Sequence, residues 1–228
     1  MNFIRFFVDF LGKKNIYISR TPYKFYNSFI EYIELNLLEN SFGVLHIGAH
    51  FGQELDKYQQ FNLKVIWIEG NPKIFDRLSK NVRTADNQRV ICALLGDRNA
   101  ENVSFFETSN DGQSSSIYQT GSKLDLVIRN SATTFHKMVR LDSILSSNEL
   151  LEHDHWVIDV QGAELLVLKG AGELIQNCKS LLIEVSRGDF YKNGSKFEDI
   201  IEFLREKGFK PILFPKDGFH GDAIFVRS

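Results

Sequence analysis

The chain has 228 residues, of which 43% are hydrophobic and 25% are charged, and its formal net charge is −2. This composition excludes a disordered chain and is typical of a globular protein that buries a sizeable core in one domain. The near-neutral charge offers no general attraction to nucleic acid, because nucleic-acid-binding proteins carry basic surfaces. The two cysteines, Cys92 and Cys178, lack metal-ligand spacing, so we expect buried, reduced thiols in a cytoplasmic protein.

Residues 1–41 are predicted to form a helical extension of the main domain. Residues 3–11 are rich in phenylalanine, but they are too few for a transmembrane segment, which needs about 20 apolar residues. We interpret them as an amphipathic helix that packs on the domain, with a membrane-surface or subunit contact as the alternative. A second helix is expected over residues 23–38, where apolar residues recur at helical intervals. The oligomeric state stays open.

The most informative stretch runs from Val44 to Glu69. An apolar run breaks at Gly48 and Gly52, a patterned segment follows, and a second apolar run ends at Glu69. This order predicts a strand, a tight turn, a helix, a second strand and an acid, as in the nucleotide-binding half of an α/β fold. Glycines let the backbone approach a ligand, and a carboxylate at the end of the second strand can accept hydrogen bonds from ribose hydroxyls. We therefore expect a ligand with an adenosine-like ribose.

The glycine spacing favours one such ligand. The three-glycine pattern of a dinucleotide site is not matched, because His50 stands where the middle glycine belongs and a pyrophosphate fits poorly against that turn. S-adenosylmethionine carries no phosphate and is the better candidate cofactor. The predicted cofactor-binding residues are Gly48, Ala49, His50, Gly52, Glu69, Asn71, Leu94 and Asp159.

Further along the chain, helices are predicted over residues 53–61 and 72–82, with Asn71 as the cap of the second helix, and a third strand over residues 89–95. An insertion of about residues 96–140 follows, with an extra strand over 103–107 and a capped helix over 141–145. Since it rises from the ligand edge of the sheet, we expect it to contact the methyl acceptor, with an ordinary surface loop as the alternative. The candidate acceptor contacts are Phe105, Phe106, Ser114, Ser115, Ser116 and Tyr118.

A buried strand over residues 156–158 ends in Asp159 and leads through a glycine turn into a helix. Another buried strand is expected over 180–185, a helix over 196–207, and a terminal strand pair over 210–214 and 222–227. The predicted fold class is α/β. The seven expected strands over residues 42–228, mostly parallel with the last strand antiparallel, resemble the Rossmann-like sheet of S-adenosylmethionine-dependent methyltransferases.

Two motifs carry a narrower resemblance. The segments Ile47-Gly48-Ala49-His50-Phe51-Gly52-Gln53-Glu54 and Ile158-Asp159-Val160-Gln161-Gly162-Ala163-Glu164 resemble the FkbM methyltransferase family, as do Leu141-Asp142-Ser143, Leu168-Lys169-Gly170-Ala171 and Ile183-Glu184-Val185-Ser186. The resemblance implies S-adenosylmethionine-dependent O-methylation of a hydroxyl on a sugar, glycan or small metabolite. One departure is His46, which stands where such methyltransferases more often have an acid.

Methyl transfer to a hydroxyl needs a group that takes the proton. Asp159 is the first candidate for this base, Glu164 the second, and His220 in the terminal hairpin the third. A helix cap is the alternative role for Asp159, and a helix-dipole contact is the alternative for Glu164. No cluster of Asp, Glu and His has metal-ligand spacing, so we expect no metal.

Two other functions compete with methyl transfer. A nicotinamide-dependent oxidoreductase is disfavoured by the glycine spacing and by the absence of a Tyr-x-x-x-Lys proton relay. A cofactor-binding or interaction module that has lost catalysis is the non-enzymatic alternative.

Overall fold

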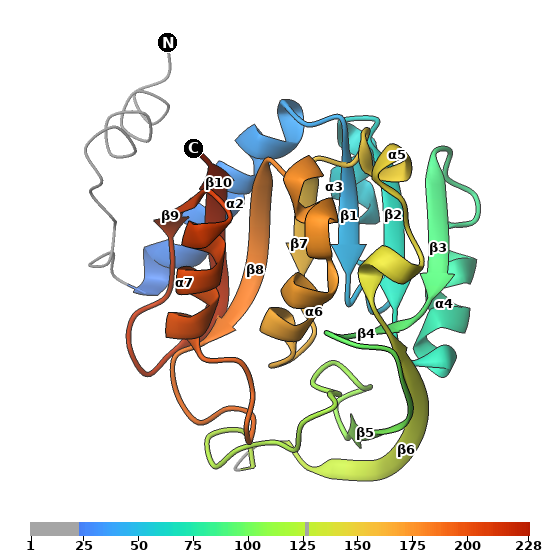
Figure 1. The fold of residues 1–228 in the computed structure, drawn as a ribbon, viewed down its shortest axis with the longest axis vertical. Helices are drawn as coiled ribbons and strands as arrows, with labels where there is room; N and C mark the ends of the chain where they lie inside the picture. Colours follow the sequence, from blue (N-terminus) through green and yellow to red (C-terminus); the bar gives the residue numbers. More distant parts are fainter. Residues whose placement is uncertain (1–22, 126–127) are drawn as a thin grey trace.

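In the computed structural model, which describes residues 23–125 and 128–228, a seven-stranded sheet forms the centre of the molecule (Figure 1). Its order is β3-β2-β1-β7-β8-β10-β9, and every pair is parallel except those of β10, which is antiparallel to β8 and β9. The predicted Rossmann-like α/β fold with an antiparallel last strand is therefore confirmed. The strands are β1 (Gly43–Ile47), β2 (Lys64–Glu69), β3 (Gln88–Cys92), β7 (His155–Ile158), β8 (Ser180–Ser186), β9 (Phe209–Leu213) and β10 (His220–Arg227). The phenylalanine-rich helix predicted over residues 3–11 lies outside the described residues.

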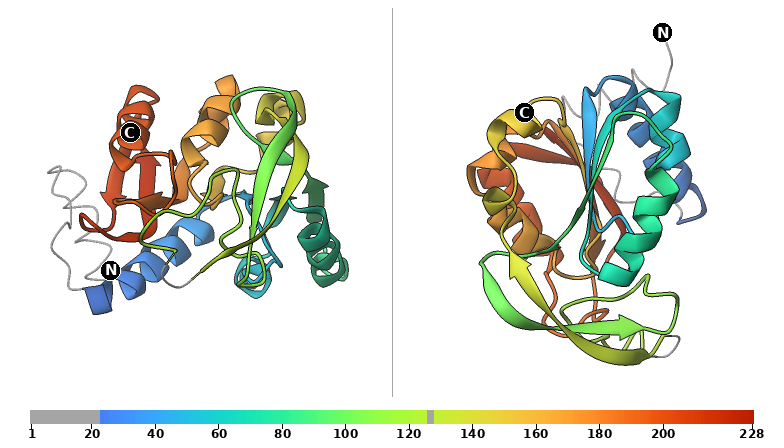
Figure 2. Two further views of the ribbon diagram at one scale, coloured as in Figure 1. Left: turned by 90° about the horizontal axis from the view of Figure 1, so that it is seen from below. Right: turned by 90° about the vertical axis from the view of Figure 1, so that its right-hand side faces the viewer.

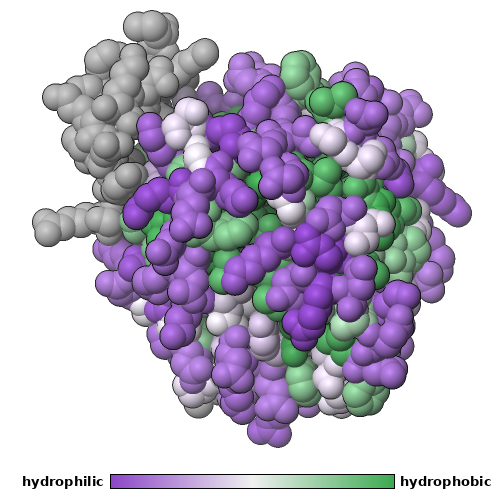
Figure 3. Space-filling view, in the orientation of Figure 1, coloured by the Kyte–Doolittle hydropathy of each residue, from purple (hydrophilic) through white to green (hydrophobic). Residues whose placement is uncertain are grey.

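Helices cover both faces of the sheet (Figure 2). The helices α2 (Tyr23–Glu39), α3 (Leu55–Gln60) and α4 (Pro72–Val82) pack on one face, and α5 (Ser147–Leu150), α6 (Glu164–Gly170) and α7 (Phe197–Glu206) pack on the other. Successive strand residues point to opposite faces of the sheet. Val44 of β1 therefore packs in the hydrophobic core under α2, α3 and α4, and Leu45 packs in the core under α5, α6 and α7. All five residues of β1 are buried, as in a parallel sheet covered on both sides. The outer surface over α6 and α7 is mainly hydrophilic, with smaller hydrophobic areas (Figure 3).

Local sequence signals explain several helix ends. The predicted helix α4 starts at Pro72, and the Asn71 side chain accepts a hydrogen bond from the Lys73 backbone N–H, 3.0 Å away. The helix predicted over residues 141–145 is instead a short 3₁₀ turn, Leu141–Ser143. The capped helix is α5, where Ser146 and Glu149 form a reciprocal capping box. A second 3₁₀ segment, Gly172–Asn177, follows α6.

The insertion differs most from the prediction. The predicted third strand is broken, because β3 ends at Cys92 and the next strand, β4 (Leu94–Leu95), leaves the main sheet and pairs with β6 (Asn130–Val139). The long strand β5 (Ala100–Thr108) pairs antiparallel with β6, which gives a second sheet of order β4-β6-β5. This sheet and its loops lie across the carboxyl ends of the main parallel strands (Figure 1).

Both cysteines are free thiols, but only Cys178 is buried. The expectation that Cys92 is buried was wrong, because β3 is an edge strand of the sheet and leaves the thiol exposed. Within residues 23–125 and 128–228, no helix is long and apolar enough to cross a membrane.

Candidate active site

A cavity of about 500 Å³ opens at the carboxyl ends of β1, β2, β7 and β8 and is closed on one side by the insertion. Most of the sequence-predicted site residues meet there. Those that line the cavity are Gly48, Ala49, His50, Glu69, Asn71, Leu94, Asp159 and His220. Gly52 and Glu164 are not part of the lining.

The turn after β1 is shaped by left-handed backbone. Gly48 has a φ of 81°, and a Cβ at this position would overlap the carbonyl oxygen of Asp159, so only glycine lets the end of β1 pack against the end of β7. His50 has a φ of 45° and joins three parts of the site. Its Nδ1 accepts from the Gln53 amide at 3.0 Å, which leaves the proton on Nε2 to donate to the Asp111 carbonyl oxygen at 3.1 Å. The histidine therefore ties the turn to the insertion.

Glu69 ends β2 inside the cavity wall, with 8% of its surface exposed. One carboxylate oxygen accepts the His50 backbone N–H at 2.9 Å, and the other accepts the Asn71 backbone N–H at 2.7 Å. Burial raises the pKa of Glu69 to about 7, although these backbone hydrogen bonds favour the ionised form. Each oxygen keeps a further lone pair for a ligand hydroxyl.

Four polar side chains form a hydrogen-bonded cluster at the ends of β7, β8 and β10. The Gln161 amide donates to Asp159 and, at 2.6 Å, to Glu184, while the Asp159 and Glu184 carboxyl groups bond to each other. His220 Nε2 lies 2.8 Å from Glu184. Burial and the neighbouring carboxyl raise the pKa of Asp159 well above its usual range, and burial raises that of Glu184 to about 8.

The protonation of this cluster follows from those shifts. Burial lowers the pKa of His220, so its ring is neutral at pH 7, and its Nδ1 lies 2.9 Å from the hydroxyl of Ser186. With Nε2–H donating to Glu184, that hydroxyl donates to Nδ1. The two carboxyl groups retain at least one proton between them near neutral pH, as expected for acids in direct contact.

The two predicted residues outside the lining stabilise the turns. Glu164 is buried and accepts the Gly162 backbone N–H at 2.8 Å, and burial raises its pKa to about 7. A Cβ on Gly52 would lie 2.9 Å from a methyl carbon of Leu78, so this glycine allows the turn to pack against α4.

His46 lines the cavity and is stacked on Trp67, with ring centroids 5.2 Å apart. Its Nδ1 lies 3.0 Å from the Tyr58 hydroxyl, and burial lowers the pKa of the imidazole. The side chain at this position is therefore neutral and cannot supply the negative charge of an acid.

The insertion contributes a wall of small polar residues. Phe105 and residues 112–117 line the cavity, whereas the predicted contacts Phe106 and Tyr118 do not. Asn110 holds the polar loop, because its amide donates to the Ser114 hydroxyl at 3.0 Å and its side-chain oxygen accepts from Thr108 at 2.7 Å.

Sequence reasoning included Gln161 and Glu184 in the segments that resemble the family but gave them no role, and it missed Tyr191. The Tyr191 hydroxyl donates to the side-chain oxygen of Gln161, which fixes the orientation of the amide. A glutamine held in this way presents its N–H₂ group to both acids. The sequence signal that could have given Gln161 and Glu184 a role was their position, because residues at the carboxyl end of a parallel strand face the ligand edge of the sheet.

The charge of the lining matches S-adenosylmethionine. Four acids line the cavity, Glu54, Glu69, Asp159 and Glu184, and no lysine or arginine does so among the described residues. Such a lining suits a ligand with a sulfonium and an ammonium group and repels a pyrophosphate. The volume lies in the range of about 300–1,000 Å³ that is usual for small-ligand sites. In the described part of the chain, no group of His, Cys, Asp and Glu is arranged to hold a metal ion.

The strand order, the glycine turn and the buried acid after β2 together define a Rossmann-like S-adenosylmethionine-dependent methyltransferase. The family model described as the methyltransferase FkbM domain matches residues 46–211. The chain therefore belongs to the FkbM methyltransferase family, and S-adenosylmethionine is its methyl donor. This membership decides against the oxidoreductase alternative.

The chain is also similar to individual known proteins. The chain is 26% identical to the 2-O-methyltransferase NoeI of Sinorhizobium fredii (strain NBRC 101917 / NGR234) over 192 residues, which cover 79% of this chain and 77% of that protein. The METTL16 methyltransferase domain shares the fold, with a TM-score of 0.50 and 12% identity over 87% of this chain and 66% of that one. Magnesium protoporphyrin IX methyltransferase (ChlM) of Synechocystis PCC 6803 aligns with a TM-score of 0.48 and 10% identity over 100% of this chain and 88% of that one.

Proposed function

We propose that the protein transfers the methyl group to a hydroxyl oxygen of a sugar, glycan or small metabolite, with Asp159 as the base. The observation that carries the proposal is the cluster of Asp159, Gln161, Glu184 and His220, which lines the same cavity as Glu69 and the glycine turn. The 26% identity to a 2-O-methyltransferase supports an oxygen acceptor.

Bound S-adenosylmethionine supplies the activated methyl group and its leaving group. The chain must hold the two substrates together and accept the proton of the hydroxyl. In our proposal, Glu69 binds the ribose hydroxyls, and the turn at Gly48, Ala49 and His50 together with Asn71 and Leu94 encloses the rest of the cofactor. Gly52 and Glu164 act as positioning residues, since neither lines the cavity.

The assignment of Asp159 as the base rests on the proton that it shares with Glu184. When one carboxyl of the Asp159–Glu184 pair is ionised, its charge is stabilised by the Gln161 amide and by the protonated partner carboxyl. Asp159 accepts while the shared proton is on Glu184, and transfer of the hydroxyl proton to Asp159 then leaves both carboxyl groups neutral.

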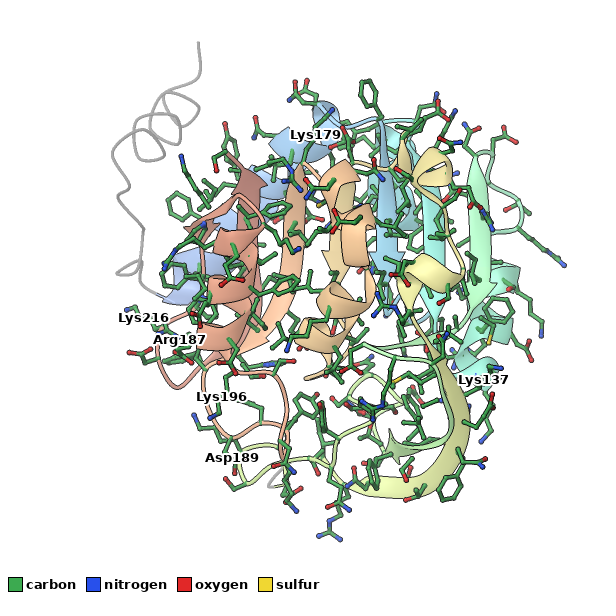
Figure 4. All side chains as sticks on the ribbon, in the orientation of Figure 1. Lys137, Lys179, Arg187, Asp189, Lys196 and Lys216 are labelled. Atoms are coloured by element: carbon green, nitrogen blue, oxygen red, sulfur yellow. The ribbon has the colours of Figure 1, made fainter. Side chains whose placement is uncertain are left out.

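A hydroxyl-rich acceptor suits the surroundings of the cluster. The hydroxyls of Ser114, Ser115 and Ser116 lie in the facing wall. A second hollow of about 460 Å³ begins behind Ser186 and Tyr191, and its lining includes Arg187 and Lys196 (Figure 4). The exposed free thiol of Cys92 fits a reducing compartment, and we propose the cytoplasm.

The test is formation of S-adenosylhomocysteine by purified protein on a panel of sugars and oligosaccharides, with mass spectrometry to locate the new methyl group. Asp159→Asn should abolish turnover and retain cofactor binding, whereas the exposed-surface control Glu173→Gln should behave like the wild type. A product methylated on nitrogen would contradict the hydroxyl acceptor, and full activity of Asp159→Asn would contradict the base.

A further inference from the structure

The acids in the cavity lining differ in whether a partner already engages them. Both oxygens of Glu69 accept backbone N–H groups, and Asp159 and Glu184 are bonded to each other and to Gln161. No hydrogen bond or ion pair within residues 23–125 and 128–228 engages the carboxylate of Glu54. Glu54 is thus the lining acid with no partner among the described residues.

The nearby cations do not neutralise Glu54. Lys57, one turn further along α3, donates to the buried Glu34 at 2.8 Å. His46, which also lines the cavity, is neutral and bonded to Tyr58. A hollow of about 130 Å³ behind the cavity is lined by Glu54 together with Glu34, Lys57 and Asp222, so the acidic character continues beyond the wall.

A free carboxylate in a cavity without lysine or arginine favours a cationic ligand group. S-adenosylmethionine has an α-ammonium group on its methionine part, at the end of the molecule opposite the adenine. The ribose acid Glu69 and the apolar Leu94 lie on the β2 side of the cavity, and Glu54 lies beyond the glycine turn at the start of α3. An elongated ligand with its ribose at Glu69 can present its ammonium group to Glu54.

We infer that Glu54 binds the α-ammonium group of the methyl donor and supplies the charge that the neutral His46 cannot. The inference deepens the proposed function, and it rests on the placement of the ribose at Glu69. It makes Glu54 a binding residue, which selects cofactors that carry the complete amino acid part.

Calorimetric titration of Glu54→Gln with three probes tests this role. S-adenosylhomocysteine carries the ammonium and the carboxylate but no sulfonium, decarboxylated S-adenosylmethionine carries the ammonium and the sulfonium but no carboxylate, and 5′-methylthioadenosine carries none of the three. We expect the dissociation constants of the first two probes to rise about 10- to 100-fold, the range for one charge-assisted hydrogen bond, and that of 5′-methylthioadenosine to stay within about twofold.

The matched control is Asp56→Asn, which removes an exposed acid two residues further along the chain, on the same helix, and should leave all three affinities unchanged. Equal losses for all three probes in Glu54→Gln would overturn the inference, because Glu54 would then act by shaping the turn. Unchanged binding of S-adenosylhomocysteine would also overturn it while leaving the proposed function intact. Wild-type protein that binds none of the probes would refute the proposed function itself.

Discussion

Replacing Glu69 by glutamine separates the charge of this residue from its shape. The carboxylate accepts two backbone N–H groups and is proposed to accept the two ribose hydroxyls. An amide nitrogen cannot accept, so Glu69→Gln places one N–H₂ group against a backbone N–H and loses at least one ribose bond. A hydrogen bond to a charged group contributes about 1.5–3 kcal/mol, so losing one weakens S-adenosylhomocysteine binding by about 10- to 100-fold.

The pH dependence of binding gives a second, independent readout. Burial raises the pKa of Glu69 to about 7, so the carboxylate is mostly ionised at pH 8 and about one-tenth ionised at pH 6. If only the ionised form binds the ribose well, wild-type affinity falls about tenfold from pH 8 to pH 6. The glutamine variant has no proton to gain at this position and should show a flat profile.

The assay is isothermal titration of S-adenosylhomocysteine at several pH values, with Asp76→Asn, an exposed acid on α4, as the control. The control should match the wild type in affinity and in pH profile. A Glu69→Gln affinity within threefold of the wild type would refute the assignment, as would a wild-type affinity that does not change with pH.

Three further predictions follow from the same geometry. Gly48→Ala should lose cofactor binding and lower the melting temperature, because the new Cβ overlaps the Asp159 carbonyl oxygen at the end of β7. Thermal scans with and without S-adenosylhomocysteine measure both effects. Tyr191→Phe removes the hydroxyl that orients the Gln161 amide, so kcat should fall at least tenfold while cofactor affinity changes little. Steady-state kinetics measure the first effect, and calorimetric titration measures the second. In the cofactor-free protein, burial raises the pKa of Glu184 to about 8 and that of Glu164 to about 7, so native protein holds protons that the unfolded chain has lost. The free energy of unfolding, measured in urea, should therefore rise by about 1 kcal/mol when the pH is lowered from 8.5 to 7. This figure allows for the buried histidines, whose lowered pKa values act in the opposite direction. A fall in the free energy of unfolding over this interval would contradict the assigned protonation.

The main sheet was predictable because its signals are local. Strands covered on both faces appear as continuous apolar runs, and the caps and glycines at their ends mark where each run stops. The helix over residues 72–82 was predicted to the residue, since Asn71 and Pro72 are both start signals. The order of motifs along the chain then identified the class of fold.

The insertion was predicted poorly because its structure depends on distant partners. In β6, residues 130–133 are all exposed, so the alternation of less and more exposed residues begins only at residue 134 and marks half of the strand. Its partner β5 lies across a long loop, and the pairing has register shifts near both ends. The break after β3 also depends on a distant partner. Leu94 and Leu95 leave the main sheet and pair with β6 in the three-stranded sheet, which does not exist without β6.

The candidate catalytic cluster shows the limit of reasoning from single residues. Asp159 was the first candidate because of its place at the end of a strand, but its protonation depends on Glu184 and on His220 beside it, which lie 25 and 61 residues away in the sequence. Desolvation alone would keep either acid protonated and useless as a base near neutral pH. Direct contact between two acids lets one hold the proton while the other carries the charge, and the Gln161 amide stabilises that charge. In the proposed mechanism, the ability to accept a proton is therefore a property of the pair, and the fold brings the two acids together by placing the ends of β7 and β8 at one edge of the sheet.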